Sequence, residues 1–127
     1  MPPVREIAAV AAGGCVGAVL RLLVNDWAVR MVPRHPAAGT LAVNVLGCFA
    51  IGAAMVWLEP RDARHPMRLL LVTGLLGSLT TFSTFGHQTV ELARAGSTRM
   101  AAANVAANVV LGVAAVLLGM TAARLTR

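Results

Sequence analysis

The sequence predicts an all-α membrane protein with four transmembrane helices, and two observations support this prediction. Hydrophobic residues make up 57% of the 127 residues and charged residues only 13%, whereas soluble domains carry about 25% charged residues. A soluble domain of this length has too little interior to bury so much apolar surface. The apolar residues also fall into four long stretches separated by short polar joints. We therefore expect a single transmembrane domain over residues 1–127.

Each apolar stretch has the length of a membrane-spanning helix, for which about 20 residues suffice. The expected helices cover about residues 4–32, 37–58, 69–93 and 99–124. The first is uncharged from residue 7 to residue 20 and is then interrupted by Arg21 and Asp26, while the central parts of the others are uncharged. Prolines in the first two joints and a glycine in the third, Gly96, are typical signals for the end of a helix.

Arginine supplies all of the positive side-chain charge, and the net charge is +6. The arginines are spread over the joints and do not form one patch, so we expect no nucleic-acid binding, which needs clustered cations. The side of the membrane with both termini would carry Arg5, Arg61, Arg64, Arg68, Arg124 and Arg127. The opposite side would carry Arg30, Arg34, Arg94 and Arg99. This bias is weak for the positive-inside rule. The chain could therefore insert in both orientations, and opposite copies could pair about an axis in the membrane plane.

The third stretch contains an unusual polar run, GLLGSLTTFSTFGHQT, at residues 74–89. Serine and threonine can bond back to their own helix, which would be a purely structural explanation. So many hydroxyls in succession instead favour a polar path. Gly77 and the Ser and Thr residues that follow also favour a break in this helix. Such breaks are tolerated where the freed backbone is buried in protein or lines a cavity, and exposed carbonyls there can bind a cation.

Two of the three phenylalanines, Phe82 and Phe85, lie in this polar run. Their spacing places them on one face of a helix. Taken alone they would be ordinary core residues. The edge of an aromatic ring is the positive end of its quadrupole, however, and attracts an anion weakly. A pore needs sites of this kind, which an ion can enter and also leave.

Two further polar side chains lie within expected spans. Asn44 interrupts the apolar second stretch, and it indicates either a hydrogen bond between helices or a pathway. Its amide offers two N–H donors, which suit a small anion. Arg21 is a functional candidate as an intramembrane charge, although it could also reach the interface or pair with Asp26.

Other functional classes fit less well. No carboxylate lies in the middle of any expected span, whereas proton-coupled carriers generally use one. This argues against a small dual-topology multidrug exporter, the main alternative, because the only early acid is Glu6 at the helix start. An assembly subunit of a larger membrane complex would leave the polar run unexplained. No nucleophile–base pair, phosphate loop or metal-spaced histidine cluster appears, so we expect no enzyme.

Three segments resemble the Fluc (CrcB) fluoride-channel family. They are GGCVGAVLRL at 13–22, GTLAVNVLGCFAIG at 39–52 and GLLGSLTTFSTF at 74–85. The third is the most specific, and the resemblance covers nearly the whole chain. It implies a passive, fluoride-selective channel in the cell inner (plasma) membrane that exports fluoride from the cytoplasm and protects against its toxicity. It also implies an antiparallel dual-topology dimer with two fluoride pathways.

The resemblance further assigns roles to individual residues. A structural sodium ion at the dimer centre would be held by the carbonyls of Gly77 and Thr80. The fluoride pathway would include Asn44, Phe82, Ser83, Thr84 and Phe85, with Arg21 near a vestibule. Three residues depart from the family pattern, namely Gln88, Asn104 and Asn108. These departures leave open whether the chain forms a homodimer or pairs with a paralogue.

Overall fold

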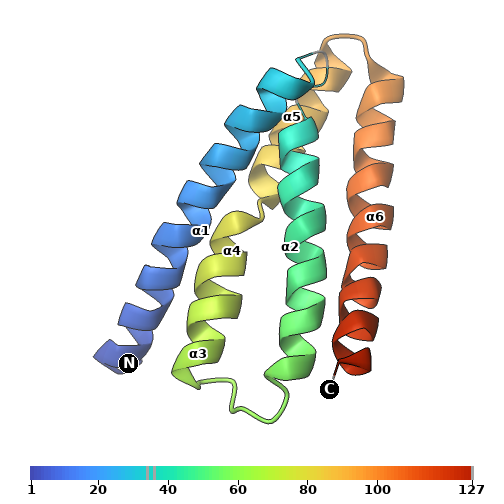
Figure 1. Cartoon of the computed structure of the whole chain (residues 1–127). Coiled ribbons are helices and arrows are strands. Elements are labelled where there is room, and N and C mark those ends of the chain that lie inside the picture. Colours follow the sequence, from blue (N-terminus) through green and yellow to red (C-terminus); the bar gives the residue numbers. More distant parts are fainter. Residues whose placement is uncertain (34, 36, 127) are drawn as a thin grey trace.

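A computed structural model describes residues 1–33, 35 and 37–126. In this part of the chain, four helical spans are long and apolar enough to cross a membrane, which confirms the predicted fold class (Figure 1). Two of the arginines expected at the interfaces, Arg34 and Arg127, lie outside the described residues.

The first, second and fourth spans are continuous α-helices. They are α1 (Val4–Met31), α2 (Ala38–Trp57) and α6 (Thr98–Leu125). The third span is built from the consecutive segments α3 (Pro66–Arg68), η1 (Leu69–Leu76), α4 (Gly77–Leu79) and α5 (Phe82–Arg94). Segment η1 is a π-helix, a form that is rare and occurs mostly as single turns, frequently at functional sites. The third span is thus irregular in η1, at the start of its polar run, and is interrupted between α4 and α5, within that run.

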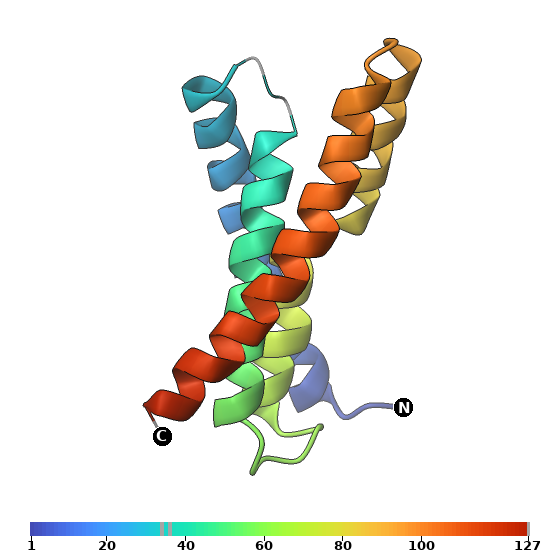
Figure 2. The same cartoon turned by 90° about the vertical axis from the view of Figure 1, so that its right-hand side faces the viewer.

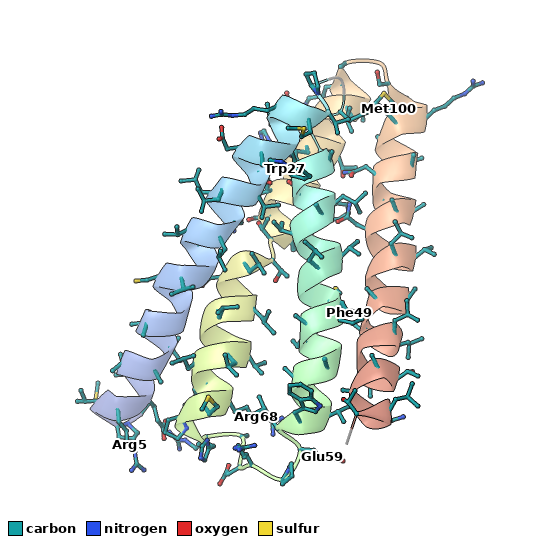
Figure 3. All side chains as sticks on the ribbon, in the orientation of Figure 1. Arg5, Trp27, Phe49, Glu59, Arg68 and Met100 are labelled. Atoms are coloured by element: carbon teal, nitrogen blue, oxygen red, sulfur yellow. The ribbon has the colours of Figure 1, made fainter. Side chains whose placement is uncertain are left out.

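Both termini and the joint between α2 and α3 lie at one end of the bundle (Figure 1). Figure 3 shows Arg5, Glu59 and Arg68 at this end, as expected for interfacial charges. An ion pair ties the start of α1 to the same joint. The Arg64 guanidinium donates to Glu6 Oε2 from Nη2 at 2.9 Å and from Nε at 3.2 Å, and Glu6 is buried.

Glycines allow the helices to pack closely in two pairs. In the pair of α1 with η1, a Cβ atom added to Gly13 would collide with the carbonyl oxygen of Leu70. In the pair of α2 with α6, a Cβ on Gly52 would collide with the carbonyl oxygen of Val116. The same kind of contact is made by Gly17 and Gly119. Small residues drive such packing because lipid supplies no hydrophobic force between helices.

Replacing Gly52 with alanine should therefore weaken the pair of α2 with α6. We expect a loss of about 1–3 kcal/mol, typical of an overpacked site, visible as a lower melting temperature in detergent. Gly112→Ala is the matched control on α6, because its Cβ would lie 3.5 Å from Cys48 Sγ, an ordinary contact. Equal melting temperatures for the two variants would contradict this account of the packing.

The bundle opens toward the end opposite the termini. In Figure 2, α5 and the first half of α6 diverge from α2 and the end of α1. Many large apolar side chains are exposed in the single chain, including Trp27 and Phe49 (Figure 3). Only 11% of the most apolar part of α1 is buried. A surface of this kind suits contact with lipid or with another membrane helix.

Candidate functional site

The third span breaks at Thr80 and Thr81, within the predicted polar run. Both residues have extended backbones, with ψ of 154° at Thr80 and 113° at Thr81, and α5 starts at the next residue. Thr81 is the N-cap of α5, since its Oγ1 accepts the N–H of Thr84 at 3.3 Å. Threonine is a favoured residue at this position. The predicted break in the third helix is therefore confirmed.

Asn44 on α2 bridges this break from the neighbouring helix. Its Oδ1 accepts the N–H of Thr81 at 2.8 Å, and its Nδ2 donates to the Thr81 carbonyl at 3.3 Å. The carboxamide of Asn44 thus satisfies both backbone polar groups of Thr81, the N–H and the carbonyl, at a point where the helix is interrupted. Of the two explanations that the sequence left open for Asn44, the structure shows a hydrogen bond between spans.

The same contacts redirect two donors away from their usual helical partners. In a continuous helix, the N–H of Thr81 would donate to Gly77 and that of Thr84 to Thr80. Here Thr81 donates to Asn44 and Thr84 donates to the Thr81 side chain. The carbonyls of Gly77 and Thr80 thereby lose their helical donors. These two carbonyls are the ones that the family resemblance assigns to a cation.

A cavity of about 340 Å³ lies at the break. Its lining includes Asn44, Gly77, Thr80, Phe82 and Phe85. The rings of the two phenylalanines are 5.3 Å apart between centroids and tilted by 60°. Phe85 is buried with 8% exposure, whereas Phe82 is 81% exposed in the single chain. In the single chain, the cavity is therefore open on the side of Phe82.

The hydroxyls that follow the break form a small cluster. Thr81 Oγ1 lies 3.2 Å from Ser83 Oγ and donates to Thr84 Oγ1 at 3.0 Å. Ser83 is exposed and Thr84 is half-buried. Thr81 belongs to the cavity lining, and among the described residues Ser83 and Thr84 do not. The hydroxyl cluster thus leads outward from the cavity along α5.

Arg21 is half-buried on α1 and does not belong to the lining of the cavity at the break. It does not pair with Asp26, because Asp26 Oδ2 binds Arg30 Nη2 at 2.9 Å, one helical turn further on. That explanation for Arg21 is wrong. The i,i+4 spacing of Asp26 and Arg30 favours their pairing, since residues four apart face each other on a helix.

Two asparagines on α6 also belong to the site, and the sequence had assigned them no role. Asn44 Nδ2 donates to Asn108 Oδ1 at 2.9 Å. Asn108 Nδ2 in turn donates to the backbone and side-chain oxygens of Asn104, at 3.0 Å and 3.2 Å. Their i,i+4 spacing on an apolar helix was a signal that they share a face. The sequence could not identify Asn44 as the partner of Asn108.

These features define the class: a small multi-pass membrane protein with a broken helix and, at the break, a largely apolar cavity whose lining includes the polar residues Asn44, Thr80, Thr81 and Asn108. A family model described as CrcB-like protein, Camphor Resistance (CrcB), matches residues 8–120. The chain therefore belongs to the CrcB-like family, as its sequence motifs predicted.

Curated relatives named fluoride-specific ion channel FluC match this chain over most of their length. The relative from Sulfurovum sp. (strain NBC37-1) is 46% identical over 88% of both chains. The one from Aeromonas salmonicida (strain A449) is 45% identical over 87% of this chain and 90% of its own. The one from Agrobacterium fabrum (strain C58 / ATCC 33970) is 42% identical over 94% of this chain and 96% of its own. With these bacterial relatives and four apolar spans, the chain is a multi-pass protein of the inner membrane.

Proposed function

We propose that this protein is a fluoride-selective passive channel, not an enzyme, which exports fluoride from the cytoplasm and so protects against fluoride toxicity. The observation that carries the proposal is the break in the third span, where Asn44 binds Thr81 beside the cavity lined by Phe82 and Phe85. It occurs in a chain 46% identical to a relative named fluoride-specific ion channel FluC. The multidrug exporter finds no support among these relatives.

A pathway of this kind must replace the water molecules that a small anion loses when it enters. Amide N–H groups, hydroxyls and aromatic ring edges can do so in steps, without a full positive charge that would hold the ion. Asn44, Phe82 and Phe85 line the cavity, and Ser83 and Thr84 extend the polar track along α5. Arg21, on α1, would attract anions toward a vestibule.

The working unit in this proposal is an antiparallel dimer with two fluoride pathways. Two observations support it. Phe82 is 81% exposed beside the cavity, which leaves its ring accessible to a second chain. The arginines are divided between the two ends with little bias, which permits insertion in both orientations. A homodimer in the lipid bilayer is the simplest assembly, and a heterodimer with a paralogue is the alternative.

A sodium ion at the centre of this dimer fits the chain. The carbonyls of Gly77 and Thr80 have lost their helical donors, and both residues line the cavity at the break. Unwound carbonyls are typical sodium ligands in membrane proteins. A bound sodium ion would take the place of the lost N–H donors at these carbonyl oxygens. It would also hold the broken third spans of two chains together.

The test is to reconstitute this chain alone in liposomes and to measure fluoride and chloride efflux after adding a potassium ionophore. We expect fluoride efflux far faster than chloride efflux, with protein-free liposomes as the control. Equal rates for the two halides would contradict the selectivity. Fluoride efflux only after a second, different subunit is added would favour the heterodimer.

A further inference from the structure

The side chain of Thr80 packs against a glycine of the neighbouring helix. A Cβ atom added to Gly47 on α2 would collide with the Thr80 methyl group, Cγ2, and would lie 3.7 Å from Thr80 Cβ. Gly13 and Gly52, in contrast, face backbone atoms of the helices against which they pack. Gly47 is buried, and both Gly47 and Thr80 line the cavity at the break. The absence of a side chain at Gly47 thus leaves a space that the Thr80 methyl group fills, and we call this space the Gly47 notch.

The preceding helical turn fixes Thr80 from its other side. Both donors of Thr80 bind the same acceptor, since its N–H donates to the Leu76 carbonyl at 3.1 Å and its Oγ1 donates to that oxygen at 3.0 Å. The hydroxyl and the methyl group are bonded to the same Cβ atom, so the hydrogen bond of the hydroxyl also fixes the direction of the methyl group. The bond to Leu76 and the Gly47 notch therefore hold one and the same rotamer.

The carbonyl of Thr80 belongs to a peptide group that α2 holds as well. This group also contains the N–H of Thr81, which donates to Asn44 Oδ1 at 2.8 Å. The described part of the chain contains no cis peptide bond, and in a planar trans peptide the N–H and the carbonyl point in opposite directions. The Thr80 carbonyl therefore points away from the Asn44 side chain. Asn44 and Gly47 are three residues apart on α2, which runs beside the break (Figure 1), and so share one face of that helix.

We propose that Gly47 is a positioning residue for the cation site: the Gly47 notch seats the Thr80 side chain and so holds the Thr80 carbonyl in the direction in which it can bind sodium. This inference rests on the proposed channel with its sodium ion and adds the helix that orients one of the ligands. A larger side chain at position 47 would push the Thr80 methyl group out of the notch, together with the backbone that carries the carbonyl. Such a shift matters because a binding site must be held to within about 0.5 Å of its productive geometry.

The alternative is that Gly47 only allows close packing, as Gly52 does between α2 and α6. The two roles differ in their effect on the sodium requirement. A ligand that binds only the folded protein raises the melting temperature once its concentration exceeds the dissociation constant. A loss of packing lowers the melting temperature at every sodium concentration and leaves this threshold unchanged. A displaced carbonyl raises the threshold.

The experiment therefore records the melting temperature of the purified chain in detergent while sodium replaces a large organic cation at constant ionic strength. For Gly47→Ala we expect the sodium concentration needed for stabilisation to rise on the order of tenfold, because an overpacked site displaces its surroundings. Gly52→Ala is the matched control on the same helix, since its Cβ would collide with backbone atoms of α6. It should melt at a lower temperature but keep the sodium requirement of the unmodified chain.

A second substitution, at Thr80, isolates the clash in the Gly47 notch. Serine at this position keeps the hydroxyl that binds Leu76 and lacks the methyl group that fills the notch. The double variant Gly47→Ala with Thr80→Ser should therefore require less sodium than Gly47→Ala alone. Thr80→Ser by itself completes the double-mutant cycle, which measures the interaction between the two positions and not the effect of either change.

An unchanged sodium requirement in Gly47→Ala, or no recovery in the double variant, would overturn the inference while the channel and its sodium site stand. If Gly47→Ala does not fold, the double variant decides: sodium-dependent melting supports the inference, and failure to fold overturns it. If the unmodified chain melts at the same temperature with and without sodium, both the sodium site and the inference are rejected. Fluoride efflux from the unmodified chain tests the channel function separately.

Discussion

Asn44→Leu should abolish fluoride efflux. The substitution keeps the size of the side chain but leaves the N–H and the carbonyl of Thr81 without the carboxamide that binds them. Each unsatisfied buried group costs about 1–3 kcal/mol, so the break should rearrange and the cavity beside it should change shape. We expect a loss of efflux of about a hundredfold or more, since 1.4 kcal/mol corresponds to tenfold, together with a lower melting temperature.

Asn25→Leu is the matched control for this variant. Asn25 is also half-buried in a membrane span, but it lies on α1 beside Gly39, away from the break. It should retain efflux close to that of the unmodified chain. If Asn44→Leu conducts fluoride normally, the contact between Asn44 and Thr81 is not needed for conduction.

Phe82→Ile should lower fluoride efflux by about tenfold with little change in stability. The substitution removes the ring edge, which is the positive end of the aromatic quadrupole and attracts an anion, while an apolar side chain of similar width remains. Stability should hardly change, because Phe82 is 81% exposed in the single chain. Efflux of fluoride from liposomes measures the first effect, and thermal unfolding in detergent the second.

Phe49→Ile provides the comparison for the loss of a ring. Phe49 is another exposed phenylalanine, on α2, and does not line the cavity at the break. Its replacement should leave efflux unchanged. An equal decrease in both variants would mean that losing any ring on the surface disturbs the channel, and Phe82 would no longer be a specific part of the pathway.

The fold could be predicted from the sequence because lipid imposes a simple rule. A long apolar stretch must form a helix, since no other local structure satisfies its backbone in a bilayer. The break could be predicted for a related reason: the hydroxyls at 80–84 offer the backbone alternative partners. The break lies at Thr80 and Thr81 because the Thr81 side chain caps α5. A cap of this kind is a local signal within the sequence.

The contacts across the break could not be predicted, because they depend on which faces of distant helices meet. Asn44 lies 37 positions before Thr81 and 64 before Asn108. No periodicity within one helix relates these positions. The π-helical turns of η1 add to the difficulty, since they alter the direction in which later side chains point. For the same reason, the sequence left Asn104 and Asn108 as unexplained departures.

The bond between Asn44 and Thr81 also has a consequence for biogenesis. The bent form of the third span depends on a partner from another helix, so the span cannot adopt it fully while it is alone in lipid. During insertion it should enter the bilayer as a more regular helix and bend only after docking against α2. The bend in the third span therefore forms late in assembly, when the spans come together.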